Sequence, residues 1–141
     1  MTASDRTDPA PKKILCVDFD GVIHSYKSKW IDEKTIPDLP VDGAIPWLYD
    51  ATRVFRVVIY SSRSKTKDGI AAMRKWLAMH ALYMLGPEHP MATGESDVEF
   101  SNEKPAAFLT IDDRAITFHG DFTTLSPEEL LKFEPWNKRE T

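Results

Sequence analysis

The chain of 141 residues is 42% hydrophobic and 28% charged, which is the balance of a soluble globular protein with one domain rather than two. No apolar run approaches the roughly 20 residues that span a bilayer, and residues 1–13 contain no apolar stretch that could act as a signal peptide; we therefore expect a cytoplasmic protein without a membrane partner. The formal net charge of −4 makes a nucleic-acid partner unfavourable, although a local basic groove would still allow one.

The composition along the chain divides it into three parts. Polar residues and proline dominate residues 1–12, where we expect a flexible leader, and residues 135–141 are expected to be a tail. A single domain is expected over 13–134, because the chain shows no internal repeat and no second kind of composition.

Continuous apolar runs at 14–17, 57–60 and 108–111 are typical of central strands in a parallel sheet. Cys16 lies inside the first run and is expected to be a buried core residue. Two further short strands are expected at 83–85 and 115–118.

Apolar residues at helical spacing predict two helices between these strands, one opened by Asp42-Gly43 and a longer one after the second strand. A third helix is expected to begin at Ser126, which is followed by proline and two glutamates. Strands that alternate with helices predict an α/β fold, a three-layer Rossmann-like parallel sheet with helices on both faces. The expected buried faces consist of Ile45, Leu48, Tyr49 and Thr52 in the first helix and Ile70, Met73, Leu77 and Ala81 in the second.

Each of the three main apolar runs ends in polar side chains. The first leads into Asp18, the second into Ser61, and the third into Asp112-Asp113. The carboxyl ends of parallel strands share one edge of a sheet, so these side chains are expected to converge there.

The turn after the first strand adds a second acid to this group. Asp20 follows Asp18 by two positions, and Gly21 lets the backbone turn so that N–H groups can face a phosphate oxygen. Phosphate-monoester hydrolysis needs accelerations of up to ~10²¹-fold, which one carboxylate alone could not supply. A catalytic metal is therefore expected, with Asp18, Asp112 and Asp113 as hard oxygen ligands for Mg²⁺ and Lys104 as a nearby cation.

This arrangement resembles the haloacid dehalogenase superfamily, whose phosphatases carry four short motifs in the same chain order. The first looks like VDFDGV at 17–22, the second like VIYS at 58–61, the third like Lys104-Pro105, and the fourth like IDDR at 111–114. The four motifs in order, each beside an expected strand end, are a far stronger signal than the first alone.

The resemblance implies a role for each matching residue. Asp18 would be the nucleophile, Asp20 the general acid and then base, and Lys104 would orient and balance Asp18. Asp112 would bind Mg²⁺ directly and Asp113 directly or through water, while the Asp20 carbonyl would complete the protein ligands. Members that cleave carbon–halogen bonds lack the second acid, so Asp20 favours phosphoryl transfer. Substrate contacts are expected from Phe19, Gly21, Ser61, Ser62 and Arg63.

The gaps between the motifs are too short for the cap domains that many members of this family carry. We expect instead a hairpin-like flap over the site at 23–38, with Trp30 as a candidate stacking surface and His24 as a mainly structural residue. Trp47 and Trp76 are expected in the core. Arg114, like Arg63, could reach a substrate phosphate or pair with an acid.

These features predict a magnesium-dependent phosphomonoester hydrolase that acts on a small phosphometabolite such as a nucleotide or a sugar phosphate. One alternative is a phosphatase of nucleic-acid ends, and another is a non-catalytic domain that binds phosphate or metal. A third alternative is a pure interaction domain. A homo-oligomer whose neighbours enclose the site is compatible with the sequence.

Overall fold

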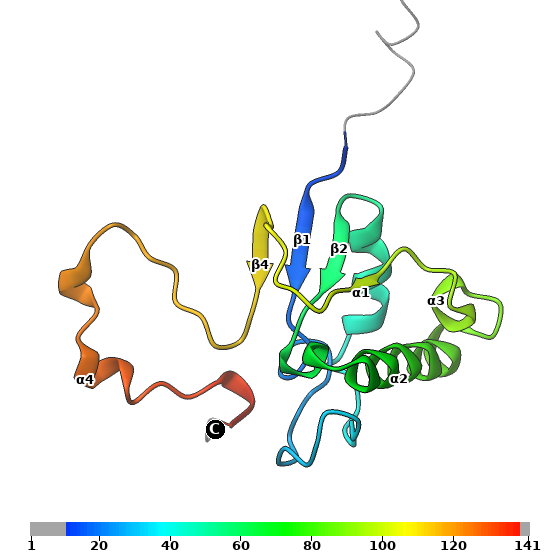
Figure 1. The fold of residues 1–141 in the computed structure, drawn as a ribbon, viewed down its shortest axis with the longest axis horizontal. Helices are drawn as coiled ribbons and strands as arrows, with labels where there is room; N and C mark the ends of the chain where they lie inside the picture. The colour runs from blue at the N-terminus through cyan, green and yellow to red at the C-terminus, as the bar shows by residue number, and fades with distance from the viewer. Residues whose placement is uncertain (1–10, 139–141) are drawn as a thin grey trace, which may run out of the picture.

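The computed structural model describes residues 11–138, which form an α/β fold around one parallel sheet. The sheet has the strand order β3-β2-β1-β4 (Figure 1), with β1 at Ile14–Val17, β2 at Arg56–Ile59, β3 at Glu99–Phe100 and β4 at Leu109–Ile111. The predicted α/β class is confirmed, and each main apolar run contributes a strand. The sequence gives no sign of β3.

The register of the sheet aligns the carboxyl ends of its three longer strands. Val17, the last residue of β1, lies opposite Ile59 of β2 and Ile111 of β4. The Asp18 N–H donates a further hydrogen bond of 2.9 Å to the Ile111 carbonyl. The residues that follow these strands therefore emerge at one edge of the sheet, where open parallel sheets bind their ligands.

β4 lies at the edge of the sheet, so the prediction that 108–111 forms a central strand is wrong. Leu109 is 52% exposed, whereas Val57 of the inner strand β2 is fully buried. Residues 115–118 form no strand and lead away from the sheet (Figure 1), so no strand within 11–138 pairs with the outer edge of β4. An apolar run identifies a strand but does not determine how many neighbours that strand has.

The two main helices are α1 (Ala44–Thr52) and α2 (Lys67–Leu85), as the apolar spacing predicts. The side chain of Thr66 caps α2 by accepting a hydrogen bond from the Gly69 N–H, and Gly86, with φ of +96°, ends it. The expected strand at 83–85 is wrong because these residues continue α2 up to that glycine.

The other helical elements are single turns. α4 begins at the predicted position, where the Ser126 side chain accepts a hydrogen bond from the Glu129 N–H. Within residues 11–138, no helix combines the length and apolar character that crossing a membrane requires. The short elements are α3 (Pro90–Thr93), α4 (Pro127–Leu130) and the 3-10 turns η2 (Ser62–Lys65), η3 (Phe122–Thr124) and η4 (Trp136–Lys138).

The core lies between one face of the sheet and the helices α1 and α2. Cys16 is buried, and Trp76 of α2 is only 4% exposed, both as predicted. Trp47 is 43% exposed, so its expected place in the core is wrong; the buried face of α1 runs through Ile45 and Leu48 instead. The core contains Leu15, Val17, Phe19, Ile23, Ile45, Leu48, Val57, Ile59, Met73, Trp76 and Leu77.

The expected flap between β1 and α1 is paired only at its base. The Ser25 N–H donates to the Leu39 carbonyl at 2.9 Å, and the Val41 N–H donates to the Ile23 carbonyl at 2.8 Å. Residues 26–38 form neither helix nor strand, and the indole N–H of Trp76 binds the Asp38 carbonyl at 3.3 Å. The flap is therefore a hairpin at its base with an irregular tip.

After β4 the chain leaves the sheet as an extended arm and returns to the flap at η4 (Figure 1). The arm, residues 115–134, exposes large apolar side chains, among them Phe118, Phe122 and Leu131. Residues 1–10 of the expected leader and 139–141 of the expected tail lie outside the described residues.

Candidate functional site

Three carboxylates meet at the carboxyl edge of the sheet. Asp18 directly follows β1, and Asp112 and Asp113 directly follow the neighbouring strand β4. Each offers a carboxylate oxygen, and these oxygens all lie within 4.8 Å of one another. The convergence predicted from the strand ends is therefore present for these three residues.

The donor set fits a cation that prefers oxygen ligands. Asp113 Oδ1 is buried and has no hydrogen-bond partner within residues 11–138, so one oxygen of this carboxylate is left for a ligand. The Asp18 Oδ1 accepts the Phe19 N–H at 2.8 Å, and the Asp112 Oδ1 accepts the Arg114 N–H at 2.8 Å. Backbone donors thus orient two of the three carboxylates.

The electrostatics of the cluster also favour a cation. Burial, the largest cause, and the nearby Asp112 and Asp113 charges together raise the pKa of Asp18 to about 8, against the opposing hydrogen bond from the Phe19 N–H. Burial likewise raises the pKa of Asp113. A divalent cation would reverse this effect, because it favours the ionised form of every carboxylate around it.

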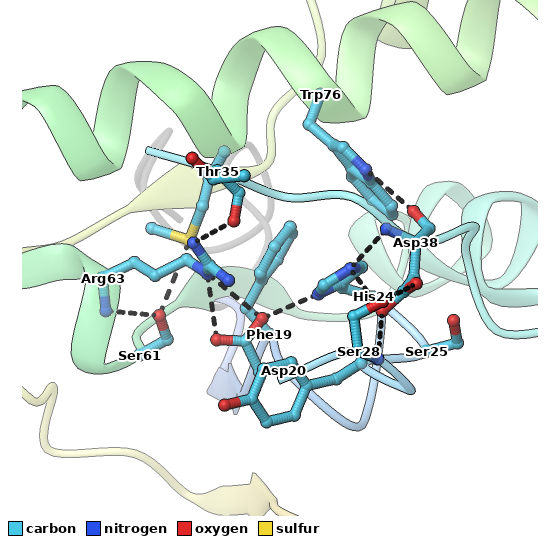
Figure 2. Close-up of polar contacts among 12 residues, drawn as sticks. Phe19, Asp20, His24, Ser25, Ser28, Thr35, Asp38, Ser61, Arg63 and Trp76 are labelled. Atoms are coloured by element: carbon cyan, nitrogen blue, oxygen red, sulfur yellow. Dashed lines mark hydrogen bonds and ion pairs between the residues drawn. The ribbon is translucent and has the colours of Figure 1, made fainter. Parts of the chain in front are cut away.

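Asp20 is held by two buried basic side chains that lie on either side of it (Figure 2). The Arg63 Nε donates to Asp20 Oδ2 at 2.9 Å and to Oδ1 at 3.1 Å. The His24 Nδ1 lies 2.8 Å from Asp20 Oδ1, and the Asp38 N–H donates to the His24 Nε2 at 3.0 Å. Because the Nε2 accepts, neutral His24 carries its proton on Nδ1 and donates it to Asp20.

Arg63 also connects this acid to the flap. Its Nη1 donates to the carbonyls of Asp32, Glu33 and Thr35 at 2.9, 3.1 and 3.0 Å, and its guanidinium carbon lies 4.7 Å from the centre of the Trp30 ring. The side chain is only 1% exposed. One buried cation therefore fixes both the second acid and the tip of the flap.

The acids open into a cavity of about 440 Å³. Among residues 11–138, three larger cavities, of about 620, 600 and 590 Å³, are not lined by any acid of the cluster. Two of them lie next to β3, where Arg56 and Glu99 form an ion pair, and the third lies beside the base of the flap. The cavity of about 440 Å³ is therefore the one that contains the candidate catalytic acids. It is lined by Asp18, Asp20, Tyr26, Trp30, Ser62, Asp112, Asp113 and Arg114.

Several residues expected at the substrate do not line this cavity. Ser61 is 5% exposed, and its hydroxyl caps η2 by accepting the Arg63 N–H at 2.9 Å, whereas the exposed Ser62 faces the cavity. The Phe19 side chain is fully buried in the core. Lys104 is exposed and forms no ion pair or hydrogen bond with Asp18 in the part of the chain that is described. Substrate binding by Ser61 and the role of Lys104 stay predictions.

Two features of the site have little or no sequence signal. The bond between His24 and Asp20 joins residues four positions apart, and that spacing beside an acidic turn is the one clue. The approach of η4 to the turn at Gly21, with the Trp136 indole N–H donating to the Gly21 carbonyl at 2.7 Å, has no signal at all.

Comparison with known proteins identifies no relative of this chain. No family model matches the chain, and neither a curated protein nor a solved structure matches it.

Proposed function

We propose that the chain is a magnesium-dependent phosphomonoester hydrolase of the haloacid dehalogenase type, with Asp18 as its nucleophile. The observation that carries the proposal is the convergence of Asp18 with Asp112 and Asp113, with ligand oxygens within 4.8 Å, at the carboxyl edge of a parallel sheet. The motif order supports it too. As part of the same proposal, the fold is the three-layer architecture of that family without a cap domain, and the flap covers the site.

In the proposed reaction, an Asp18 carboxylate oxygen attacks the phosphorus of the substrate and the bond from phosphorus to the leaving oxygen breaks. Asp20 gives a proton to that oxygen, so an alcohol leaves and an aspartyl phosphate remains. Asp20 then accepts a proton from the water that attacks the phosphorus, which releases inorganic phosphate and restores Asp18. Mg²⁺ bound by Asp18, Asp112 and Asp113 would offset the negative charge of nucleophile and substrate.

Asp20 can serve this role because side chains on the side away from the cavity hold its carboxylate in place. Arg63 and His24 hold its carboxylate, and both are buried away from the cavity. We therefore assign Arg63 to positioning rather than to substrate binding. Ser62 and Arg114, which line the cavity, are the better candidates for contacts to the phosphoryl group.

The proposed substrate is a small phosphomonoester, such as a nucleotide or a sugar phosphate. The cavity of about 440 Å³ is of the size that holds one small molecule, and Tyr26 and Trp30 contribute aromatic rings to its wall. Of the cavity-lining residues, only Arg114 is basic, and a nucleic-acid strand would need several phosphate contacts.

A second candidate is a domain that binds metal and phosphate without turnover. The specific observation in its favour is that Lys104 makes no ion pair with Asp18 within the described residues, although the resemblance expects Lys104 to balance that charge. Substrate and metal would have to draw the exposed lysine to the site for the leading proposal to hold.

Turnover of p-nitrophenyl phosphate by the full chain tests the two candidates. We expect turnover that needs Mg²⁺, stops in a chelator and is lost in Asp18→Asn. Asp50→Asn is the matched control, because Asp50 is an exposed acid of α1 outside the site. A folded protein that binds Mg²⁺ but turns over neither this substrate nor any member of a phosphometabolite panel would favour the non-catalytic candidate.

A further inference from the structure

The turn η4 near the C-terminus donates hydrogen bonds to backbone carbonyls on two sides of the candidate site. The Asn137 Nδ2 donates to the carbonyls of Ser25 and Tyr26 at 2.9 and 3.0 Å. The Lys138 Nζ donates to the Tyr26 carbonyl at 3.0 Å and to the Lys27 carbonyl at 3.2 Å. These partners are 111–112 positions apart in the sequence, so the contacts connect the end of the chain to the start of the flap.

A third residue of the same turn reaches the acidic turn after β1. The Trp136 indole N–H donates to the Gly21 carbonyl at 2.7 Å, one residue after Asp20. The carbonyls of Gly21 and Tyr26 therefore both accept hydrogen bonds from side chains of η4. Because each donor is a side-chain group, single substitutions can remove it without changing the backbone.

Tyr26 has the backbone conformation that most needs external support. Its φ is +54°, and it is the one non-glycine residue among 11–138 with positive φ. An L-residue is strained there unless its surroundings hold it. The Tyr26 carbonyl accepts from both Asn137 and Lys138, and the Lys138 Nζ lies 5.0 Å from the centre of the Tyr26 ring. That ring lines the candidate site.

Much of the arm is exposed. Phe118, Phe122 and Leu131 are 52%, 78% and 88% exposed, and α4 and η3 bury none of their residues. The position of η4 therefore depends on its contacts with the flap and the acidic turn, together with the buried Pro135 directly before it. The same contacts, in return, fix Tyr26 in the wall of the cavity.

We propose that Trp136, Asn137 and Lys138, named here the C-terminal clamp, are positioning residues that hold Tyr26 and the flap in place and so determine how the site binds the part of a substrate beyond its phosphate. The expected change in KM rests on the proposed function. The expected change in the protection of the flap does not. The clamp touches none of the proposed reacting groups, so its loss should change KM and leave kcat nearly unchanged.

The structural consequence is measured by amide hydrogen exchange of the full chain without substrate. Asn137→Asp keeps the size of the side chain but replaces the donor with a carboxylate that faces the carbonyls of Ser25 and Tyr26. We expect exchange in the flap to be about tenfold faster, because two hydrogen bonds are lost. Lys138→Met should have a similar but smaller effect, and Lys138→Arg should restore protection because it keeps a donor and a cation.

Lys132→Met is the matched control, since Lys132 is an exposed lysine of the arm that pairs with Glu129. Circular dichroism checks that each variant is folded. Flap exchange that stays at the wild-type rate in both folded variants, Asn137→Asp and Lys138→Met, would overturn the proposal. So would an equal increase in Lys132→Met.

The kinetic consequence is measured with two substrates, p-nitrophenyl phosphate and acetyl phosphate. We expect the clamp variants to raise KM for the aryl phosphate about tenfold with kcat within about threefold, and to leave KM for acetyl phosphate unchanged because it has no ring to meet Tyr26. Equal increases in KM for both substrates would contradict the proposal that the clamp determines how the site binds the part of a substrate beyond its phosphate. If the wild-type chain turns over neither substrate, the proposed function fails, and the exchange experiment alone decides the clamp.

Discussion

Gly21 and Asp113 lie so close together that a β-carbon on Gly21 would stand 2.7 Å from the Asp113 carboxylate carbon. Gly21 also has φ of +84°, which side chains other than glycine's rarely allow. Only glycine therefore lets the acidic turn after β1 approach the acids after β4, and the three-carboxylate cluster depends on this absence of a side chain.

Gly21→Ala should therefore weaken the metal site beyond the effect of backbone strain. We expect the free energy of unfolding to fall by about 2–4 kcal/mol and the Mg²⁺-dependent rise in melting temperature to disappear. Gly94→Ala is a matched control, because Gly94 has the same φ of +84° and nothing within 4 Å of the added carbon. Calorimetry with and without Mg²⁺ measures both quantities. Equal Mg²⁺ stabilisation in the two variants would contradict this account of the cluster.

Arg63→Met should be among the most destabilising single substitutions in the chain. It leaves the Asp20 carboxylate without its main cationic partner and three flap carbonyls without their donor. Removal of one partner from a buried ion pair costs about 3–5 kcal/mol, and the slight exposure of Asp20 places our expectation at about 3 kcal/mol. Urea denaturation gives the value.

Arg53→Met provides the comparison, since Arg53 pairs with Asp50 at 3.7 Å in an exposed setting and should change stability by less than about 1 kcal/mol. If Arg63→Met were as stable as Arg53→Met, the buried network around Asp20 would not hold the flap as described.

Ser61 and Ser62 should respond differently to alanine. Ser61→Ala removes the cap of η2 and should cost about 1 kcal/mol of stability. Ser62→Ala removes a hydroxyl from the cavity wall and should weaken binding of inorganic phosphate in the presence of Mg²⁺ while leaving stability nearly unchanged. Isothermal titration and urea denaturation of both variants test this, and the reverse pattern would return the phosphate contact to Ser61.

The metal-free protein should lose stability as the pH rises. The pKa of Asp18 is raised to about 8 in the folded chain, above its value of roughly 4 when unfolded. Between these values the folded state binds more protons than the unfolded state, so the free energy of unfolding falls as the pH increases through this window. The Asp18→Asn variant has no carboxyl group at this position, so its free energy of unfolding should lack this part of the pH dependence.

Melting temperatures in a chelator from pH 5 to pH 8 measure the effect, and saturating Mg²⁺ should reduce the slope of the wild type because the cation favours the ionised form. Parallel curves for the wild type and Asp18→Asn in the chelator would show that the cluster does not destabilise the ionised form of Asp18.

The sequence was sufficient for those features that follow from local pattern and sheet geometry. Continuous apolar runs predicted β1, β2 and β4, and the shared edge of parallel strands predicted the meeting of Asp18 with Asp112 and Asp113. Apolar spacing likewise predicted both long helices. These inferences need only the residue types and the rule that parallel strands end together.

Other features depend on neighbours that the sequence does not identify. The edge position of β4 follows from the path of residues 115–118 away from the sheet, and the apolar run at 108–111 looks the same in either case. Whether Ser61 or Ser62 faces the cavity depends on the orientation of the η2 turn. The contacts of Arg63 with the flap and of Trp136 with Gly21 join segments about 30 and 115 positions apart and have no local pattern.

Direct detection of the phosphorylated residue tests the central claim. Asp20→Asn should slow breakdown of the aspartyl phosphate, so this variant is mixed with a labelled aryl phosphate and Mg²⁺ and quenched in acid, which preserves acyl phosphates. Peptide mapping should then place the label on Asp18, hydroxylamine should release it, and the double variant with Asp18→Asn should carry none. Turnover by a folded Asp18→Asn protein, or a label on any other residue, would contradict the account.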